Sequence, residues 1–282
     1  MELWYCFGFR YSDLNKVIDI HSHILPGIDD GPETMDETLE MAWAYERAGF
    51  EAVIATPHHI PGTSWHVHPE TIRRLVSHVN DTLVHEGIRL HLKPGMEIGL
   101  APEVPRLLSE KGLLTLADSC YLLLESPFQR LPLNWEQTIF DLAAHGYRIV
   151  WAHPERCGQL QEEPELLNRI LQLGGFLQVN WGSILEYNGS DVCAFAKQMI
   201  GQGRVHCMAT DSHDALSRRP DNAVAGMRAL EDMAGLETVD MLARENPGRI
   251  LRSETLNNVA PAPGASRERS NGTRRFFQWK RR

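Results

Sequence analysis

Short apolar runs alternate with amphipathic segments along most of this 282-residue chain, and no other feature of the sequence restricts its fold as strongly. The runs are typical of β-strands buried on both faces, and several segments between them end in glycine, as helices often do. A strand followed by a helix, repeated, predicts parallel β/α units. The expected strands are 17–23, 52–58, 90–98, 121–125, 148–153, 176–180 and 205–210. The expected helices are 33–48, 69–86, 135–145, 164–173, 192–200 and 223–233.

Seven such units in about 240 residues predict an α/β fold in the form of a closed or distorted (β/α)7 barrel. A doubly wound open sheet is the competing topology, and in both cases the functional site belongs at the C-terminal ends of the strands. We expect residues 1–15 to be an N-terminal extension and residues 16–254 to form the barrel. Residues 255–282, which end in RRFFQWKRR, are expected to be a basic, flexible tail.

Charge and cysteine content exclude several classes of protein. The net charge is −9 although the C-terminal segment is basic, so the body of the chain is acidic, which argues against extended nucleic-acid binding. No apolar run reaches the roughly 18 to 20 residues of a membrane helix, and the N-terminus lacks the pattern of a signal peptide. The five cysteines form no CxxC pair. We therefore expect free thiols and a cytoplasmic location.

Side chains that can bind metal ions follow almost every expected strand. The first strand ends in His21 and His23, whose imidazoles lie on the same side of a strand. Burying many such groups at one end of a barrel without cations would cost much in desolvation and carboxylate repulsion, so we expect a metal cluster. The candidates further along the chain are Asp30, His58, Glu97, Glu125, His153, Asp211 and His213.

The ligand types narrow the choice of metal and point to phosphate. Nitrogen and oxygen donors without cysteine favour Mn²⁺, Fe²⁺ or Zn²⁺ in a catalytic site over a structural zinc. Arg156 and Arg218 stand in the loops after the fifth and seventh expected strands, where they would overhang the metals and bind phosphate oxygens. His59 adjoins a ligand and is assigned to substrate binding. His66 and His68 are expected in a loop at the substrate rim.

These motifs resemble the polymerase and histidinol phosphatase (PHP) superfamily. Within it, they are most similar to the bacterial metal-dependent tyrosine-protein phosphatases encoded with capsule and exopolysaccharide genes. ENPGRIL, at residues 245–251, is similar to the family's final helix, and the resemblance covers roughly residues 16–253. The other matching segments occur in the family's order as IDIHSHILPGIDDGP, ATPHH, GMEI, LLLES, AHPER, QVN and TDSHD.

The resemblance implies a seven-stranded distorted barrel that holds three divalent metal ions, most often Mn²⁺. It implies ligand roles for the nine metal-capable residues named above and phosphate binding by Arg156 and Arg218, and we count both arginines and Asp211 as catalytic. It also implies that the substrate is a tyrosine-phosphorylated protein, a partner tyrosine kinase that controls capsule or exopolysaccharide synthesis.

The predicted reaction is hydrolysis of a phosphotyrosine monoester by a metal-activated hydroxide. The Cys-x5-Arg motif of thiol-dependent tyrosine phosphatases is absent, because no cysteine here is followed by arginine at the sixth position. Two alternatives stay open: the same chemistry on a small molecule such as histidinol phosphate, and a non-catalytic, metal-stabilised binding module. A metal-dependent amidohydrolase is disfavoured, because such barrels commonly use a lysine that no expected strand end offers.

Overall fold

The computed structural model describes residues 17–261, so the expected N-terminal extension and most of the expected tail lie outside the described residues. Residues 255–261 lie against the barrel. Leu256 is buried, and the backbone N–H of Asn257 donates to Asn246 Oδ1 at 2.8 Å. The packed part of the chain therefore extends past residue 254, where we predicted that the tail begins. No described helix is both long enough and apolar enough to cross a membrane.

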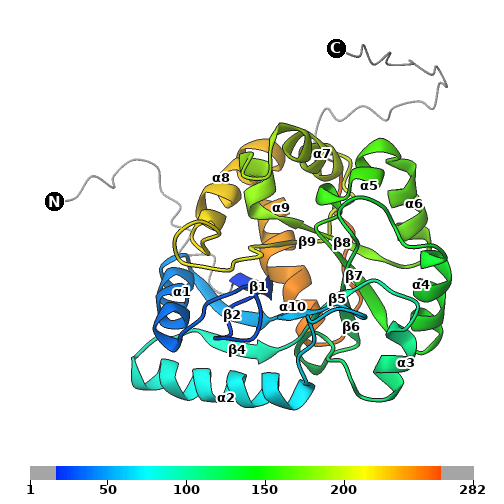
Figure 1. Cartoon of the computed structure of the whole chain (residues 1–282). Coiled ribbons are helices and arrows are strands. Elements are labelled where there is room, and N and C mark those ends of the chain that lie inside the picture. The colour runs from blue at the N-terminus through cyan, green and yellow to red at the C-terminus, as the bar shows by residue number, and fades with distance from the viewer. Residues whose placement is uncertain (1–16, 262–282) are drawn as a thin grey trace, which may run out of the picture.

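Parallel strands form the centre of the molecule (Figure 1). Hydrogen-bonded neighbours follow the order β1-β2-β4 in one sheet and β3-β5-β6-β7-β8-β9 in the other. The strands are β1 (Val17–Ser22), β2 (Phe50–Ala55), β3 (His58–His59), β4 (His91–Pro94), β5 (Glu97–Gly99), β6 (Tyr121–Glu125), β7 (Arg148–Ala152), β8 (Phe176–Asn180) and β9 (Cys207–Ala209).

Two of the expected strands are interrupted near their C-terminal ends. The second is divided into β2 and β3, and the third into β4 and β5. Gly95 stands at the second break, where a Cβ atom would lie only 2.7 Å from Ile54 Cγ2. Glycine is thus required for the close approach of this segment to β2. After the breaks, β3 and β5 pair with each other, and β5 pairs onward with β6.

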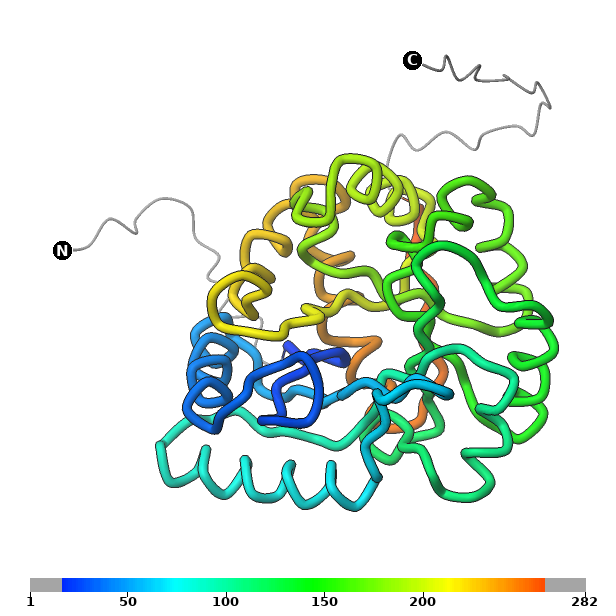
Figure 2. Tube along the Cα trace, viewed as in Figure 1, coloured from blue at the N-terminus to red at the C-terminus, as the bar shows by residue number. Residues whose placement is uncertain are grey.

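Backbone contacts between β1 and the segment after β9 bring the first and last strands together. Ser22 and Ser212 form a parallel bridge, and the His23 N–H donates to Ser212 O at 2.9 Å. Figure 2 shows the dark blue start of the described chain beside the yellow segment that follows β9. Since β2 runs on into β3 and β4 into β5, the strands follow one another around a distorted α/β barrel, as the sequence predicted.

Helices cover the outside of the barrel (Figure 1). Each of the expected helices is present, with ends shifted by at most two residues. We did not predict α3, α5 and α9, because one or two turns are too short to display a helical period. The α-helices are α1 (Met35–Arg47), α2 (Pro69–His85), α3 (Val104–Ser109), α4 (Trp135–Ala144), α5 (Gly158–Glu162), α6 (Glu165–Gln172), α7 (Ser190–Gly201), α8 (Asn222–Ala234), α9 (Leu236–Asp240) and α10 (Asn246–Leu251).

Side chains that alternate along the strands form two apolar clusters. In β6, Leu122 and Leu124 belong to the larger cluster, which includes the buried faces of the surrounding helices. Tyr121 and Leu123 belong to the smaller cluster, together with Ile250 of α10. Burial on both faces explains why the strand sequences show no regular polar alternation.

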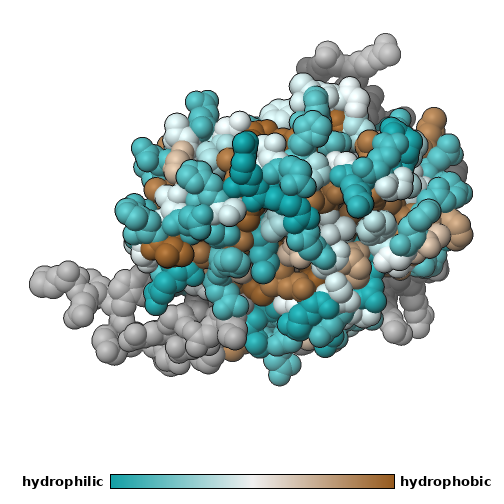
Figure 3. Space-filling model, turned by 90° about the horizontal axis from the view of Figure 1, so that it is seen from below, coloured by the Kyte–Doolittle hydropathy of each residue, from teal (hydrophilic) through white to brown (hydrophobic). Residues whose placement is uncertain are grey.

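The outer surface is polar where helices face solvent. Figure 3 views the molecule from the side on which α2 lies in Figure 1, and hydrophilic residues cover most of that face, with apolar residues in small separate groups. On α2, Ile72, Val79 and Leu83 are fully buried, whereas Val84 is exposed. This pattern is typical of an amphipathic helix packed on a barrel.

One buried histidine outside the strand ends links stability to pH. The backbone N–H of Leu177 donates to His206 Nδ1 at 3.2 Å, so this nitrogen acts as an acceptor. Burial lowers the pKa of His206 to about 4, below its ordinary value of 6.5. The unfolded chain therefore takes up a proton at a higher pH than the folded chain, and the folded state loses stability as the pH falls from about 6.5 to about 4.

We predict that His206→Gln, which cannot take up this proton, loses less stability than the wild type over that pH range. The difference should be on the order of 2 kcal/mol, measured by urea unfolding of the metal-free protein at pH 7 and pH 4.5. His85→Gln, on the exposed end of α2, is the matched control and should follow the wild type. Equal pH dependence for His206→Gln and the wild type would contradict the prediction.

Candidate active site

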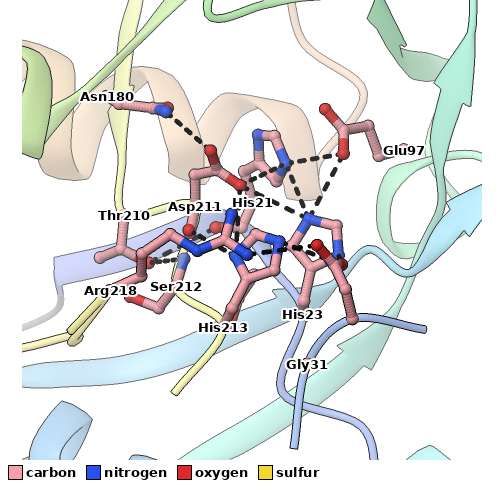
Figure 4. A network of polar contacts seen from close by, with 12 residues as sticks. His21, His23, Gly31, Glu97, Asn180, Thr210, Asp211, Ser212, His213 and Arg218 are labelled. Carbon is pink, nitrogen blue, oxygen red and sulfur yellow. Dashed lines mark hydrogen bonds and ion pairs between the residues drawn. The ribbon is translucent and has the colours of Figure 1, made fainter. Parts of the chain in front are cut away.

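The C-terminal strand ends bring together all nine metal-capable side chains expected from the sequence. Their ligand atoms form four overlapping groups, within each of which the atoms lie within 4.8 Å of one another. Figure 4 shows several of these side chains, which come from opposite ends of the chain, facing one another. The groups are His23–Asp30–His58–His213, His21–His23–Asp211, His21–Glu97–His153 and His58–Glu97–Glu125.

Glu97, at the start of β5, lies at the centre of this cluster and is fully buried. Its Oε2 atom is 3.0 Å from His58 Nδ1 and 3.3 Å from both His21 Nε2 and His23 Nε2. Its Oε1 atom is 2.9 Å from His153 Nε2. A carboxylate that faces four imidazoles could contribute to more than one cation position, and bound cations would there offset its charge.

Unsatisfied polar atoms show that the cluster fits divalent cations. Glu97 Oε2, His58 Nδ1 and His213 Nε2 are buried and form no hydrogen bond, although each lies 3.0 to 3.2 Å from an atom of opposite charge type in the cluster. Buried polar atoms are rarely left in this state, because each loses its hydration without compensation. All three atoms belong to the groups described above, and a bound cation would satisfy them.

Protonation of three histidines balances part of the carboxylate charge, because the pKa values of His21, His23 and His58 are raised. At His213, in contrast, burial and the neighbouring His23 lower the pKa. Burial opposes the charged form of His58, but the carboxylates of Asp30 and Glu97, 3.4 and 3.0 Å away, outweigh it and raise the His58 pKa to about 10. Burial also disfavours the charged form of Glu97, yet the surrounding histidines hold its pKa well below the usual range. At Glu125, burial and the neighbouring Glu97 raise the pKa. Cations that bind here therefore replace protons.

Hydrogen bonds behind three of the histidines direct the opposite ring nitrogen toward the cluster. His23 Nδ1 lies 2.7 Å from Asp29 Oδ2, and His21 Nδ1 lies 2.9 Å from Gln178 Oε1. His213 Nδ1 lies 2.9 Å from the backbone oxygen of Asp211. Each acceptor favours the tautomer with the proton on Nδ1, which leaves the Nε2 lone pair free to bind a metal.

Two of these orienting residues were missed in the sequence. We assigned a role to Asp30 but none to the preceding Asp29, although the two aspartates are adjacent in the sequence. Gln178 precedes Asn180 by two residues on β8, and its Nε2 donates to Asn180 Oδ1 at 2.7 Å. The Nδ2 atom of Asn180 donates in turn to Asp211 Oδ2 at 2.8 Å (Figure 4). A chain of neutral amides thus connects the ligand candidates His21 and Asp211.

The backbone is strained where two ligand candidates leave their strands. His153 has φ of 29° and Asp211 has φ of 51°, values that residues other than glycine seldom adopt. At Gly31, a Cβ atom would lie 1.9 Å from the backbone oxygen of His23. Only glycine permits the loop that carries Asp30 to approach the first strand so closely. Strain of this kind is typical of functional sites.

A cavity of about 610 Å³ opens above the cluster, and both predicted arginines line it. Arg156 Nη1 donates to Asp211 Oδ2 at 2.9 Å, and Arg218 Nη2 donates to Asp30 Oδ2 at 3.2 Å. The guanidinium of Arg156 also lies 4.5 Å from the centre of the Phe128 ring. The geometry therefore places two cations beside the metal-capable groups, as phosphate binding requires.

Three further histidines, His59, His66 and His68, were predicted to lie near the substrate and not to bind metal. His59 is half-buried on β3 and is not among the residues that line the cavity. Burial and the nearby His66 and His68 lower the His59 pKa. His66 and His68 are likewise not among the residues that line the cavity. Trp65, between them in sequence, does line the cavity, and its ring lies 5.5 Å from that of His58.

Comparison with known proteins identifies the family. A family model described as capsular polysaccharide synthesis, CpsB/CapC, matches residues 17–252. The chain belongs to the CpsB/CapC family. This membership confirms the resemblance found in the sequence, and the match includes every strand and helix given above.

Two relatives and one crystal structure illustrate the similarity. The chain is 37% identical over 247 residues to the tyrosine-protein phosphatase YwqE of Bacillus subtilis, which covers 88% of this chain and 96% of that protein. It is 27% identical over 246 residues to the tyrosine-protein phosphatase CpsB of Streptococcus agalactiae serotype III. This match covers 84% of this chain and 99% of that protein. One matching structure comes from a crystallographic description of YwqE from Bacillus subtilis and CpsB from Streptococcus pneumoniae, which it calls unique metal-dependent tyrosine phosphatases. It matches this chain with a TM-score of 0.82 and 36% sequence identity, and the match covers 87% of this chain and 98% of that chain.

The position of Glu97 leads to a prediction about metal binding. In the wild type, Mn²⁺ at about one hundred times its dissociation constant should stabilise the fold by roughly 2.7 kcal/mol. Glu97→Gln should lose most of this stabilisation, because a neutral amide keeps the volume but cannot bridge cations. Thermal unfolding with and without Mn²⁺, together with metal analysis of the dialysed protein, measures the effect.

Glu136→Gln is the matched control, since Glu136 pairs with Arg169 on the exposed side of α4. It should respond to Mn²⁺ as the wild type does. If Glu97→Gln folds normally and binds the same number of ions with the same affinity, Glu97 is not at the centre of a metal site.

Proposed function

We propose that this chain is a metal-dependent protein-tyrosine phosphatase that hydrolyses phosphotyrosine monoesters. The observation that carries the proposal is the position of two arginines in one cavity directly above nine metal-capable side chains, six of which are buried. The names of YwqE and CpsB as tyrosine-protein phosphatases support the same reaction. The proposal covers both the reaction and the residue roles given below.

The chain's own residues bind and orient the phosphate. Divalent ions held by the cluster would activate water and offset negative charge on the phosphoryl group. Arg156 and Arg218 bind the phosphate oxygens, because each keeps N–H donors beyond the one that contacts a carboxylate. Asp211 holds Arg156 with Oδ2, while its Oδ1 lies 3.4 Å from His21 Nε2 and 3.5 Å from His23 Nε2. A tyrosine leaving group has a pKa of about 10 and needs little protonation.

We propose that three divalent ions occupy the site, with manganese as the first candidate. Support comes from the four ligand groups, which share His21, His23, His58 and Glu97 and thus describe neighbouring positions. Nitrogen and oxygen donors together suit Mn²⁺, Fe²⁺ and Zn²⁺. The described cysteines are free, and none belongs to these groups.

We further propose that the physiological substrate is a bacterial tyrosine kinase that acts in capsule or exopolysaccharide synthesis. The family description, capsular polysaccharide synthesis, supports this process. We propose the cytoplasm as the compartment, in keeping with the free cysteines among the described residues.

Apolar walls around the cavity favour an aromatic leaving group. Trp65 and Phe128 line the cavity with exposed rings, and Leu100 and Pro127 add apolar surface. A phenyl ring gains from stacking and burial against such walls, whereas histidinol carries a polar imidazole and a charged amine whose desolvation offsets much of that gain. This arrangement favours phosphotyrosine over histidinol phosphate, although both carry the same phosphate group.

The first test is an assay of chelated protein restored with Mn²⁺, using a phosphotyrosine peptide and p-nitrophenyl phosphate. Phosphate release should require the metal. Asp211→Asn should reduce kcat by at least about a hundredfold, and Arg156→Ala by about 10²- to 10³-fold, because each removes charge that acts on the reacting phosphate. Arg73→Ala, which breaks an exposed pair with Asp118, is the control and should leave the rate unchanged.

Turnover without metal, or wild-type rates in both site variants, would refute the proposal. Release from histidinol phosphate but from no phosphotyrosine peptide would assign the same chemistry to a small molecule. A folded, metal-loaded protein that hydrolyses no phosphate ester would indicate a binding module.

A second test concerns the aromatic wall. Trp65→Ala should raise KM for a phosphotyrosine peptide by about three- to tenfold, the value of one aromatic contact, and should change KM for an aliphatic phosphate less. Trp43→Ala, on the outer face of α1, is the matched control. An equal change for both substrates would show that Trp65 does not select the aryl group.

A further inference from the structure

A second cavity, of about 290 Å³, opens beside the first and has no role in the reaction described above. The segments after β8 and β9 form its walls, including Tyr187, Asn188 and Arg219. Both cavities are lined by Arg156, Asp211 and Arg218. The arginines that we assign to phosphate binding thus border both spaces, and a peptide held at its phosphotyrosine in the first cavity has the second within reach.

Three guanidinium groups line this second cavity, although the chain as a whole has a net charge of −9. They belong to Arg156, Arg218 and Arg219, and Asp211 is the one carboxylate among the lining residues. Each arginine pairs with one aspartate, yet each guanidinium has five N–H donors and keeps some of them for a further acceptor. Charge-assisted donors of this kind can bind an anion, and the uncharged polar side chains nearby can complete its hydrogen bonds.

Arg219 is the guanidinium in this cavity that makes no contact with the metal-capable groups. It forms two hydrogen bonds to Asp221 and is 43% exposed at the side chain, so a ligand can reach it from solvent. Arg156 and Arg218, in contrast, are each held by an aspartate of the cluster. Arg219 can therefore be altered without removing a group that contacts the cluster.

The segment after β8 supplies aromatic and amide side chains to the lining of this cavity. A Cβ atom on Gly182 would lie 3.1 Å from the Tyr187 ring, so the ring packs on this glycine. Tyr187 is still 59% exposed and offers a flat surface at the rim. Asn188 Nδ2 donates to Ser183 Oγ at 3.2 Å, which fixes its amide in the same wall.

We propose that the second cavity is a substrate subsite that binds an acidic side chain close in sequence to the phosphotyrosine, with Arg219 as its selecting residue. This inference rests on the proposed function, because it assumes a phosphotyrosine peptide in the first cavity. The anion is a carboxylate, or a second phosphate carried on the same peptide, and the two are separated experimentally below.

The test measures binding rather than turnover. Peptides carry a difluoromethylphosphonate analogue of phosphotyrosine, which resists hydrolysis, with glutamate or alanine at each of the nearest positions on either side. For the Mn²⁺-loaded wild type, the dissociation constant of the peptide with glutamate at the preferred position should be about five- to tenfold lower than that of the peptide with alanine there. This is the gain expected from one charge-assisted hydrogen bond. This ratio should shrink as salt is raised, because the contact is partly exposed.

Arg219→Glu should abolish or reverse the glutamate preference, and Arg219→Gln should reduce it. The matched control is Arg252→Glu, since Arg252 forms the same kind of exposed pair with the acidic residue two positions on, Glu254, and lines neither cavity. It should keep the wild-type ratio. Melting temperatures of the variants establish that each is folded.

The outcomes distinguish the two proposals. If the peptides bind but neither glutamate nor a second phosphotyrosine analogue gives an advantage over alanine, or if Arg219→Glu and Arg252→Glu change the ratio equally, the subsite is refuted while the phosphatase stands. If no analogue peptide binds and no phosphotyrosine substrate is hydrolysed, the proposed function itself fails. A peptide with a second phosphotyrosine analogue in place of glutamate identifies the preferred anion: tighter binding than glutamate assigns the subsite to phosphate, and weaker binding to carboxylate.

Discussion

Repulsion and desolvation among buried ionisable groups at the strand ends govern the rest of this structure. Glu97 and the imidazoles around it are removed from water, and in the absence of cations only shared protons offset the carboxylate charge. Such an arrangement is stable only if each group is held in place by neighbours and supplied with opposite charge. The strained backbone at His153 and Asp211, and the close approach permitted by Gly31, are local consequences of bringing these groups together.

The apolar core and the metal-capable side chains occupy opposite ends of the barrel. Apolar side chains fill the interior toward the N-terminal ends of the strands, where Ile250 and Leu256 pack with Tyr121 and Leu123. This core provides the hydrophobic stabilisation that a metal-binding end, rich in desolvated polar groups, cannot provide. The loops after the strands can then vary around a fixed cluster, as is usual for barrels of parallel strands. Both cavities are built from such loops.

Much of the fold and of the cluster could be predicted because both depend on local sequence. Strands buried on both faces leave continuous apolar runs, and parallel strands bring their C-terminal ends to one edge, so residues such as Glu125 and His153 could be assigned without coordinates. Short helices left no periodic signal. Gln178 was missed because an uncharged residue inside a strand gains its role only from the imidazole that it faces.

The sequence by itself determined the order of the β/α units, the ligand candidates and the absence of a Cys-x5-Arg motif, since these depend on residue type and spacing along the chain. Only the tertiary structure decided which histidine nitrogens face the cluster, which residues around His59 line the first cavity, and that Arg219 joins Arg156 beside a second cavity. The reason is physical: ring orientation, cavity shape and local charge depend on distances between residues that are far apart in the chain, and folding alone sets those distances.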